Sequence, residues 1–71
     1  MPSFVIEFHR HTRDRRVTEF SSPREAMEYR LKLESARTDE NIEIAALTSK
    51  SRETLERTHS RYFTGKELAA Q

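Results

Sequence analysis

The sequence predicts an α+β fold with the element order ββαβα, in which a three-stranded antiparallel sheet of strand order 2-1-3 packs with two helices. Three observations predict this fold. Apolar residues alternate with other residues over positions 4–8, at the spacing of a β-strand. A helix-start signature begins at Ser22, and a second apolar run of strand-like composition covers positions 42–48.

The size and composition of the chain predict one small domain with a thin core. The 71 residues are enough for a single domain, expected over residues 1–65, and residues 66–71 are expected to form a flexible C-terminal tail. There is no cysteine to form a disulfide or a cysteine zinc site. Hydrophobic residues make up 34% of the chain and charged residues 35%, so a homodimer would thicken a core that is limited in one copy.

The first expected strand, residues 3–9, places Phe4, Ile6 and Phe8 on one face and Val5 on the other. It is the most apolar strand and therefore belongs in the middle of the sheet.

The second expected strand, residues 15–20, has a less regular pattern. Val17 and Phe20 are three positions apart, which would put them on opposite faces of a straight strand. A bulge, or departure of Phe20 from the strand, would resolve this. The connection contains no Asn-Gly or Asp-Gly pair, which favours a longer, mobile hairpin loop over a two-residue turn.

The first helix has the clearest start signal in the chain. Ser22 is placed to cap it, Pro23 suits its first turn, and Glu25 completes a capping box. Apolar residues then recur at helical spacing in one main stripe, with a second stripe beside it: Ala26, Tyr29, Leu33 and Ala36, then Met27 and Leu31. We expect this helix to cover the face of the sheet that carries Phe4, Ile6 and Phe8.

The third strand and the second helix complete the pattern. Both faces of residues 42–48 are apolar, which predicts a strand covered on both sides. The second helix is expected over about residues 52–64, with Gly65 as its C-cap. Three residues compete for its N-cap: Thr48, Ser49 and Ser51.

The face covered by the second helix is left open by the sequence. This helix either joins the first one or covers the opposite face of the sheet. If it does not cover that face, Val5, Ala45 and Leu47 would be exposed, which makes these three residues candidates for binding a partner.

The expected hairpin tip, residues 9–16, concentrates the positive charge of the chain. It holds four arginines, two histidines and one aspartate. Guanidinium groups match phosphate oxygens in geometry, so the candidate residues for nucleic-acid or anion binding are Arg10, Arg13, Arg15 and Arg16. The net charge of the whole chain is only +1, which weakens any long-range attraction to nucleic acid.

Two other groups of residues have the side chains of a chemical site, and each also has a simpler structural explanation. Glu7, His9 and His11 alternate at a spacing that would let a strand present three zinc ligands, but such polar residues are also common on solvent-facing strands, and we favour that interpretation.

His59, Arg61 and Tyr62 offer a base, a phosphate clamp and an acid of the ribonuclease type. A pair of His and Tyr at the edge of a core is the simpler explanation. We therefore expect no catalytic residues, no metal site and no cofactor.

The sequence thus favours a non-enzymatic interaction module of regulatory type, cytoplasmic and homodimeric, whose partner is a second copy or another protein. The alternative is a nucleic-acid-binding protein that uses the arginine-rich hairpin tip, with or without toxin-like ribonuclease activity. No segment has the length and hydrophobicity of a membrane span, so no membrane partner is expected.

Overall fold

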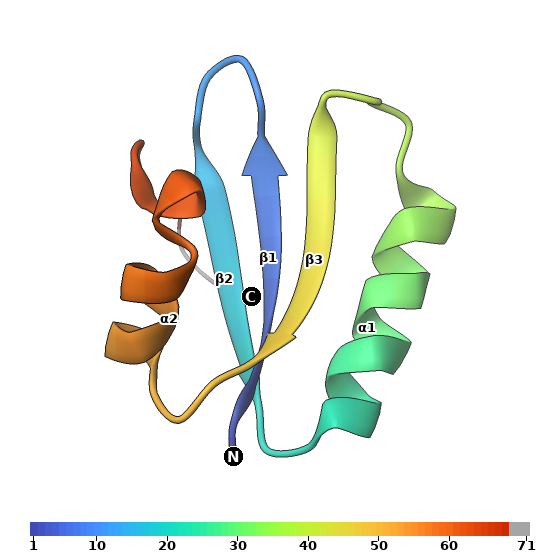
Figure 1. Cartoon of the computed structure of the whole chain (residues 1–71). Coiled ribbons are helices and arrows are strands. Elements are labelled where there is room, and N and C mark those ends of the chain that lie inside the picture. The colour runs from blue at the N-terminus through green and yellow to red at the C-terminus, as the bar shows by residue number, and fades with distance from the viewer. Residues whose placement is uncertain (69–71) are drawn as a thin grey trace.

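A computed structural model, which describes residues 1–68, confirms the predicted α+β fold. The chain forms β1 (Ser3–His9), β2 (Arg15–Phe20), α1 (Pro23–Ala36), β3 (Ile42–Thr48), α2 (Arg52–Thr58) and the 3₁₀ helix η1 (Ser60–Phe63). The three strands form one sheet in the order β2-β1-β3, and β1 is antiparallel to both of its neighbours. Figure 1 shows the two α-helices on either side of the strands.

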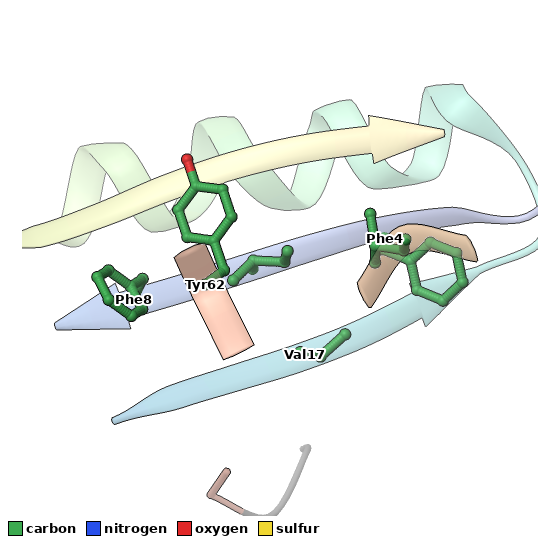
Figure 2. Packing of buried hydrophobic residues seen from close by; sticks show 6 residues of the cluster. Phe4, Phe8, Val17 and Tyr62 are labelled. Atoms are coloured by element: carbon green, nitrogen blue, oxygen red, sulfur yellow. The ribbon is translucent and has the colours of Figure 1, made fainter. Parts of the chain in front are cut away.

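The central strand β1 is buried on both faces. Phe4, Ile6 and Phe8 on one face and Val5 on the other are each at most 4% exposed. The packing partners of the first face are Val17, Leu55 and Tyr62, which come from β2, α2 and η1; Figure 2 shows Tyr62 lying across this face. Each face of the sheet therefore has its own apolar layer.

The prediction that the first helix covers Phe4, Ile6 and Phe8 is wrong. That face is covered by α2 and η1. Helix α1 packs on the opposite face, where its only buried residue is Ala26 and its Tyr29 ring contacts Phe20 at 5.3 Å between centroids. The sequence could not decide this point because both faces of β1 are apolar enough to bind a helix.

The expected partner-binding set of Val5, Ala45 and Leu47 assumed that the three residues share one face of the sheet, and the strand register separates them. In the antiparallel register Val5 pairs with Ala46, while Ala45 pairs with Ile6. Ala45 and Leu47 therefore lie on the face of Ile6 and pack against the core under α2, and Val5 is fully buried under α1. The three residues do not form one surface.

Strand β2 is regular, and the predicted bulge or departure of Phe20 is absent from it. Its pairing with β1 runs without a shift from Ser3 opposite Phe20 to Phe8 opposite Arg15. Val17 and Phe20 do point to opposite faces, and each finds an apolar layer there. A sheet covered on both sides makes the irregular sequence pattern compatible with a straight strand.

The helix starts follow the capping signals. Ser22 accepts a hydrogen bond from the backbone N–H of Glu25 at 3.2 Å, and its hydroxyl donates to the Glu25 carboxylate at 3.1 Å. At α2, Ser51 is the N-cap among the three candidates, since its hydroxyl accepts from the N–H of Thr54. Side-chain oxygens thus satisfy N–H groups that have no partner within the helix.

The predicted second helix is too long by six residues. It ends at Thr58, His59 leaves the helical conformation at φ −127° and ψ 47°, and the chain continues as η1. The break reorients the chain so that Leu55 and Tyr62 both reach the core. Gly65 is therefore not a helix C-cap.

Gly65 is required by a close approach of two backbone segments. A Cβ atom added at this position would lie 2.0 Å from the carbonyl oxygen of Arg13. Arg13 has a φ of 64° in the hairpin loop. The sole glycine of the sequence therefore lets the chain after η1 pass against the tip of the β1–β2 hairpin.

The segment after Gly65, expected to be a tail, is attached to the sheet as far as Leu68. The N–H of Arg15 donates to the carbonyl of Lys66 at 2.9 Å, and the N–H of Leu68 donates to the carbonyl of Arg15 at 2.6 Å. These bonds form a short parallel bridge on the outer edge of β2. Residues 69–71, the rest of the predicted tail, lie outside the described residues.

Replacing Gly65 by alanine should destabilise the protein by about 1–3 kcal/mol, the usual cost of forcing a methyl group into occupied space. Urea unfolding measures this difference. Lys66→Ala, a change of an exposed neighbour, should cost less than about 0.5 kcal/mol. Equal stability of Gly65→Ala and the wild type would contradict the close approach to Arg13.

Candidate functional site

The hairpin loop, residues 10–14, is held by hydrogen bonds that start from His9. The N–H of His9 donates to the carbonyl of Asp14, and the N–H of Arg13 donates to the carbonyl of His9. The Nδ1 atom of His9 also accepts from the N–H groups of His11 and Thr12, each at 3.3 Å. The imidazole of His9 therefore shapes the loop.

This arrangement separates the residues of the suggested zinc site. His11 follows the end of β1 and lies in the turn, so that it does not continue the alternation of Glu7 and His9. His9 uses Nδ1 for the loop, and its Nε2 lies 3.5 Å from Asp39. Over residues 1–68, no group of three or more histidine, aspartate or glutamate side chains is placed to hold a metal ion.

The four arginines of the hairpin do not form one surface. Arg15 is 12% exposed at its side chain and belongs to the core side of the sheet, where its guanidinium lies 4.7 Å from the centre of the Phe63 ring. It donates to the carbonyl of Gly65 at 2.7 Å and pairs with Glu67 at 3.3 Å. Arg15 thus fastens the C-terminal segment.

Arg52 completes this attachment from α2. It contacts Glu67, and its guanidinium lies 5.8 Å from the Phe63 ring. The hydrogen bond from Arg52 lowers the pKa of Glu67 below its ordinary value and raises the pKa of Arg52. Arg15 and Arg52 therefore bind the C-terminal segment through the ionised carboxylate of Glu67.

Arg16 lies on the other face of the sheet, directly opposite Glu7. With Glu7, His9 and Ile42 it lines a cavity of about 220 Å³ between the hairpin and the start of β3. Arg15 and Arg16 are thus separated by the sheet itself, as neighbouring residues of a strand must be.

Arg10 and Arg13 remain at the tip, and the structure brings a third arginine to them. Arg10 lies 3.3 Å from Oε1 of Glu43, and Arg61 of η1 lies 3.2 Å from the same oxygen. Arg13 contacts the hydroxyl of Thr64 at 3.5 Å, next to η1. We call Arg10, Arg13 and Arg61, with Glu43 between two of them, the arginine cluster.

Glu43 is the centre of this cluster and also anchors η1 to the sheet. The hydroxyl of Tyr62 donates to its Oε2 at 2.6 Å, and Figure 2 shows the Tyr62 hydroxyl pointing toward β3. This hydrogen bond and the two arginines lower the pKa of Glu43. Burial of the phenol, together with the charge of Glu43, raises the pKa of Tyr62.

The three residues of the suggested ribonuclease-type site therefore each make other contacts. Tyr62 is bound to Glu43, the Arg61 guanidinium stacks 4.7 Å from the centre of the Tyr62 ring, and the Nδ1 atom of His59 lies 2.9 Å from the hydroxyl of Thr58. Sequence reasoning missed Glu43 as the residue that joins η1 to the hairpin. Its isolated negative charge in an apolar strand was the available signal.

A second surface lies at the outer edge of β3. In an antiparallel strand, alternate residues direct their N–H and C=O groups toward each neighbour. The N–H of Arg10 donates to the carbonyl of Asn41, and the N–H of Ser49 donates to the carbonyl of Pro2. The backbone groups at odd positions of β3 therefore face β1, and those of Ile44, Ala46 and Thr48 point outward. Within residues 1–68, no backbone hydrogen bond reaches these outward groups.

Helix α1, which packs beside β3, carries two exposed apolar side chains. Its Tyr29 contacts Phe20 of β2. Met27 and Leu31 lie at helical spacing on the side of α1 turned away from Tyr29, and they are 43% and 54% exposed. We call this surface the open edge. It consists of the outward backbone groups of Ile44, Ala46 and Thr48 together with the side chains of Met27 and Leu31.

Comparison of the chain with protein-family models, with curated proteins and with solved structures finds no match. None of the helices within residues 1–68 combines the length and the apolar character that crossing a bilayer requires.

The Tyr62→Phe variant should lose about 1.5–3 kcal/mol of stability near neutral pH, the usual contribution of a hydrogen bond to a charged group. Because the folded-state pKa of Glu43 lies below its ordinary value of 4.5, this stabilisation is present above that pH and is lost as the pH falls through the folded pKa. Urea unfolding at neutral pH and at about pH 3 measures it.

Tyr29→Phe is the matched control, since its ring packs on Phe20 and not near Glu43. Its effect should not change over the same pH range. A Tyr62→Phe effect that is independent of pH would contradict a role of the Glu43 carboxylate in holding η1.

Proposed function

We propose that this protein is a non-enzymatic interaction module that forms a homodimer through the open edge, by antiparallel pairing of β3 with β3 of a second copy. The observation that carries the proposal is the difference between the two edges of the sheet. The β2 edge is partly covered by residues 66–68 of the same chain, whereas the outward groups of Ile44, Ala46 and Thr48 in β3 have no backbone partner within residues 1–68.

The composition of the two edge strands supports the same conclusion. Soluble proteins protect sheet edges with charges, prolines, bulges or a covering segment. β2 carries three charged residues, whereas β3 is seven residues long, has the sequence IEIAALT, and carries a single charge at Glu43. A regular edge with so little charge is suited to adding another strand.

A second copy is the partner that fits the flank of this edge best. A two-fold axis through the middle of β3 would bring the two α1 helices side by side in opposite directions. Met27 and Leu31 would then meet their equivalents. Arg30 and Glu34, which pair at 3.2 Å within α1 and share its β3 flank, could exchange partners across the axis.

The test is sedimentation velocity of the wild type and of Ala46→Pro at low and high protein concentration. The N–H of Ala46 points outward, so proline removes a donor needed by the second copy without breaking the pairing with β1. We expect a dimer for the wild type and a folded monomer for Ala46→Pro. Ala46→Ser, which keeps the N–H, should remain a dimer.

Leu31→Lys tests the flank of the open edge without a backbone change. A charge at this exposed position should weaken the dimer because it would meet its equivalent near the two-fold axis. A wild type that sediments as a monomer at high concentration would refute the proposal, as would a dimer unaffected by both substitutions.

A further inference from the structure

We infer that the arginine cluster binds the phosphodiester backbone of nucleic acid, independently of base sequence. This inference goes beyond the proposed homodimer and does not depend on it. Its basis is the meeting of Arg10 and Arg61 at Glu43, from two segments far apart in the chain, with Arg13 of the same hairpin tip linked through Thr64 to the segment of Arg61.

The contacts among these residues form a connected path over that surface. Arg10 and Arg61 meet at Oε1 of Glu43. Thr64 accepts a hydrogen bond from Arg13, and its own hydroxyl lies 3.5 Å from the carbonyl of Arg61. Three guanidinium groups and one carboxylate leave two positive charges in excess within this path.

Glu43 fixes two of the arginines but leaves donors available on both. Arg10 uses Nη2 for Glu43, and its side chain is 56% exposed. Arg61 uses Nη2 for Glu43 and Nη1 for the Tyr62 hydroxyl, and its side chain is 62% exposed. A guanidinium carries five N–H donors, so each group keeps donors that an anion can reach. Holding them in place reduces the entropy cost of binding.

The arrangement suits a chain of phosphates better than a single anion. The three arginines extend from the hairpin tip to η1, and none of them lines the cavity beside Arg16. Ring stacking on bases is not favoured, because Tyr62 is only 8% exposed and Arg61 lies over its ring. Contacts to phosphates alone position a protein on nucleic acid without reading its sequence.

The test is fluorescence anisotropy with short labelled RNA and duplex DNA of mixed sequence, over a series of salt concentrations. We expect weak binding, with a binding constant whose logarithm falls linearly with the logarithm of salt concentration, because phosphate contacts release counterions. The double variant Arg10→Gln/Arg61→Gln should bind about tenfold more weakly at low salt. On duplex DNA, its slope should be smaller by about 0.9 for each phosphate that the variant no longer neutralises.

Two further variants distinguish the loss of phosphate contacts from a folding defect and from a general effect of charge. Arg13→Gln removes a member of the cluster that does not contact Glu43, and it should weaken binding and reduce the slope by itself. Arg24→Gln makes the same charge change on the exposed start of α1, where the side chain is 88% exposed, and it should leave the slope unchanged. Sedimentation of the variants separates this result from any change in dimerisation.

Three outcomes would overturn the inference. The first is the absence of binding to RNA and DNA at low salt. The second is equal weakening by Arg24→Gln and Arg13→Gln, which would indicate a general effect of net charge. The third is binding of a labelled polyglutamate peptide with the same affinity and the same dependence on Arg10, Arg13 and Arg61, which would assign the cluster to an acidic protein partner.

Discussion

Burial of β1 on both faces is the constraint on which the rest of the structure depends. A three-stranded sheet with one central strand has little area, and Phe4, Ile6 and Val5 are removed from water only if each face is covered. The chain provides one helix for each face. Because α1 takes the face of Val5, the short α2 and η1 must together cover the face of Phe4 and Ile6.

That division explains why the C-terminal third is fastened by polar contacts. Leu55 is the one buried residue of α2, and Tyr62 is the one buried residue of η1. Because α2 and η1 bury so few apolar residues, hydrogen bonds and ion pairs of charged side chains also hold them to the sheet. Glu43 holds Tyr62 and Arg61, while Arg15 and Arg52 hold Glu67. Some charges of this highly charged chain therefore serve the fold.

The same constraint decides which surfaces remain for interaction. Covering both faces of β1 leaves the two sheet edges. Within residues 1–68, the segment after Gly65 covers part of the β2 edge, while Ile44, Ala46 and Thr48 of β3 keep outward backbone groups without a backbone partner. Arg15 is used in packing, whereas Arg10 and Arg13 stay at the hairpin tip and are joined there by Arg61. The proposed dimer surface and the proposed phosphate surface therefore use different residues, and each can be changed without the other.

The sequence by itself determined the strands, their order, the start of α1 and the arginine-rich turn, because local periodicity, capping and turn composition act over a few residues. Only the tertiary structure decided which helix covers which face, since Phe4 and Val5 both lie on apolar faces of β1. It also decided that Arg61 joins Arg10 at Glu43 and that Gly65 passes Arg13. These contacts join residues from opposite ends of the chain, and no local pattern encodes which distant segment will occupy a given place in the fold.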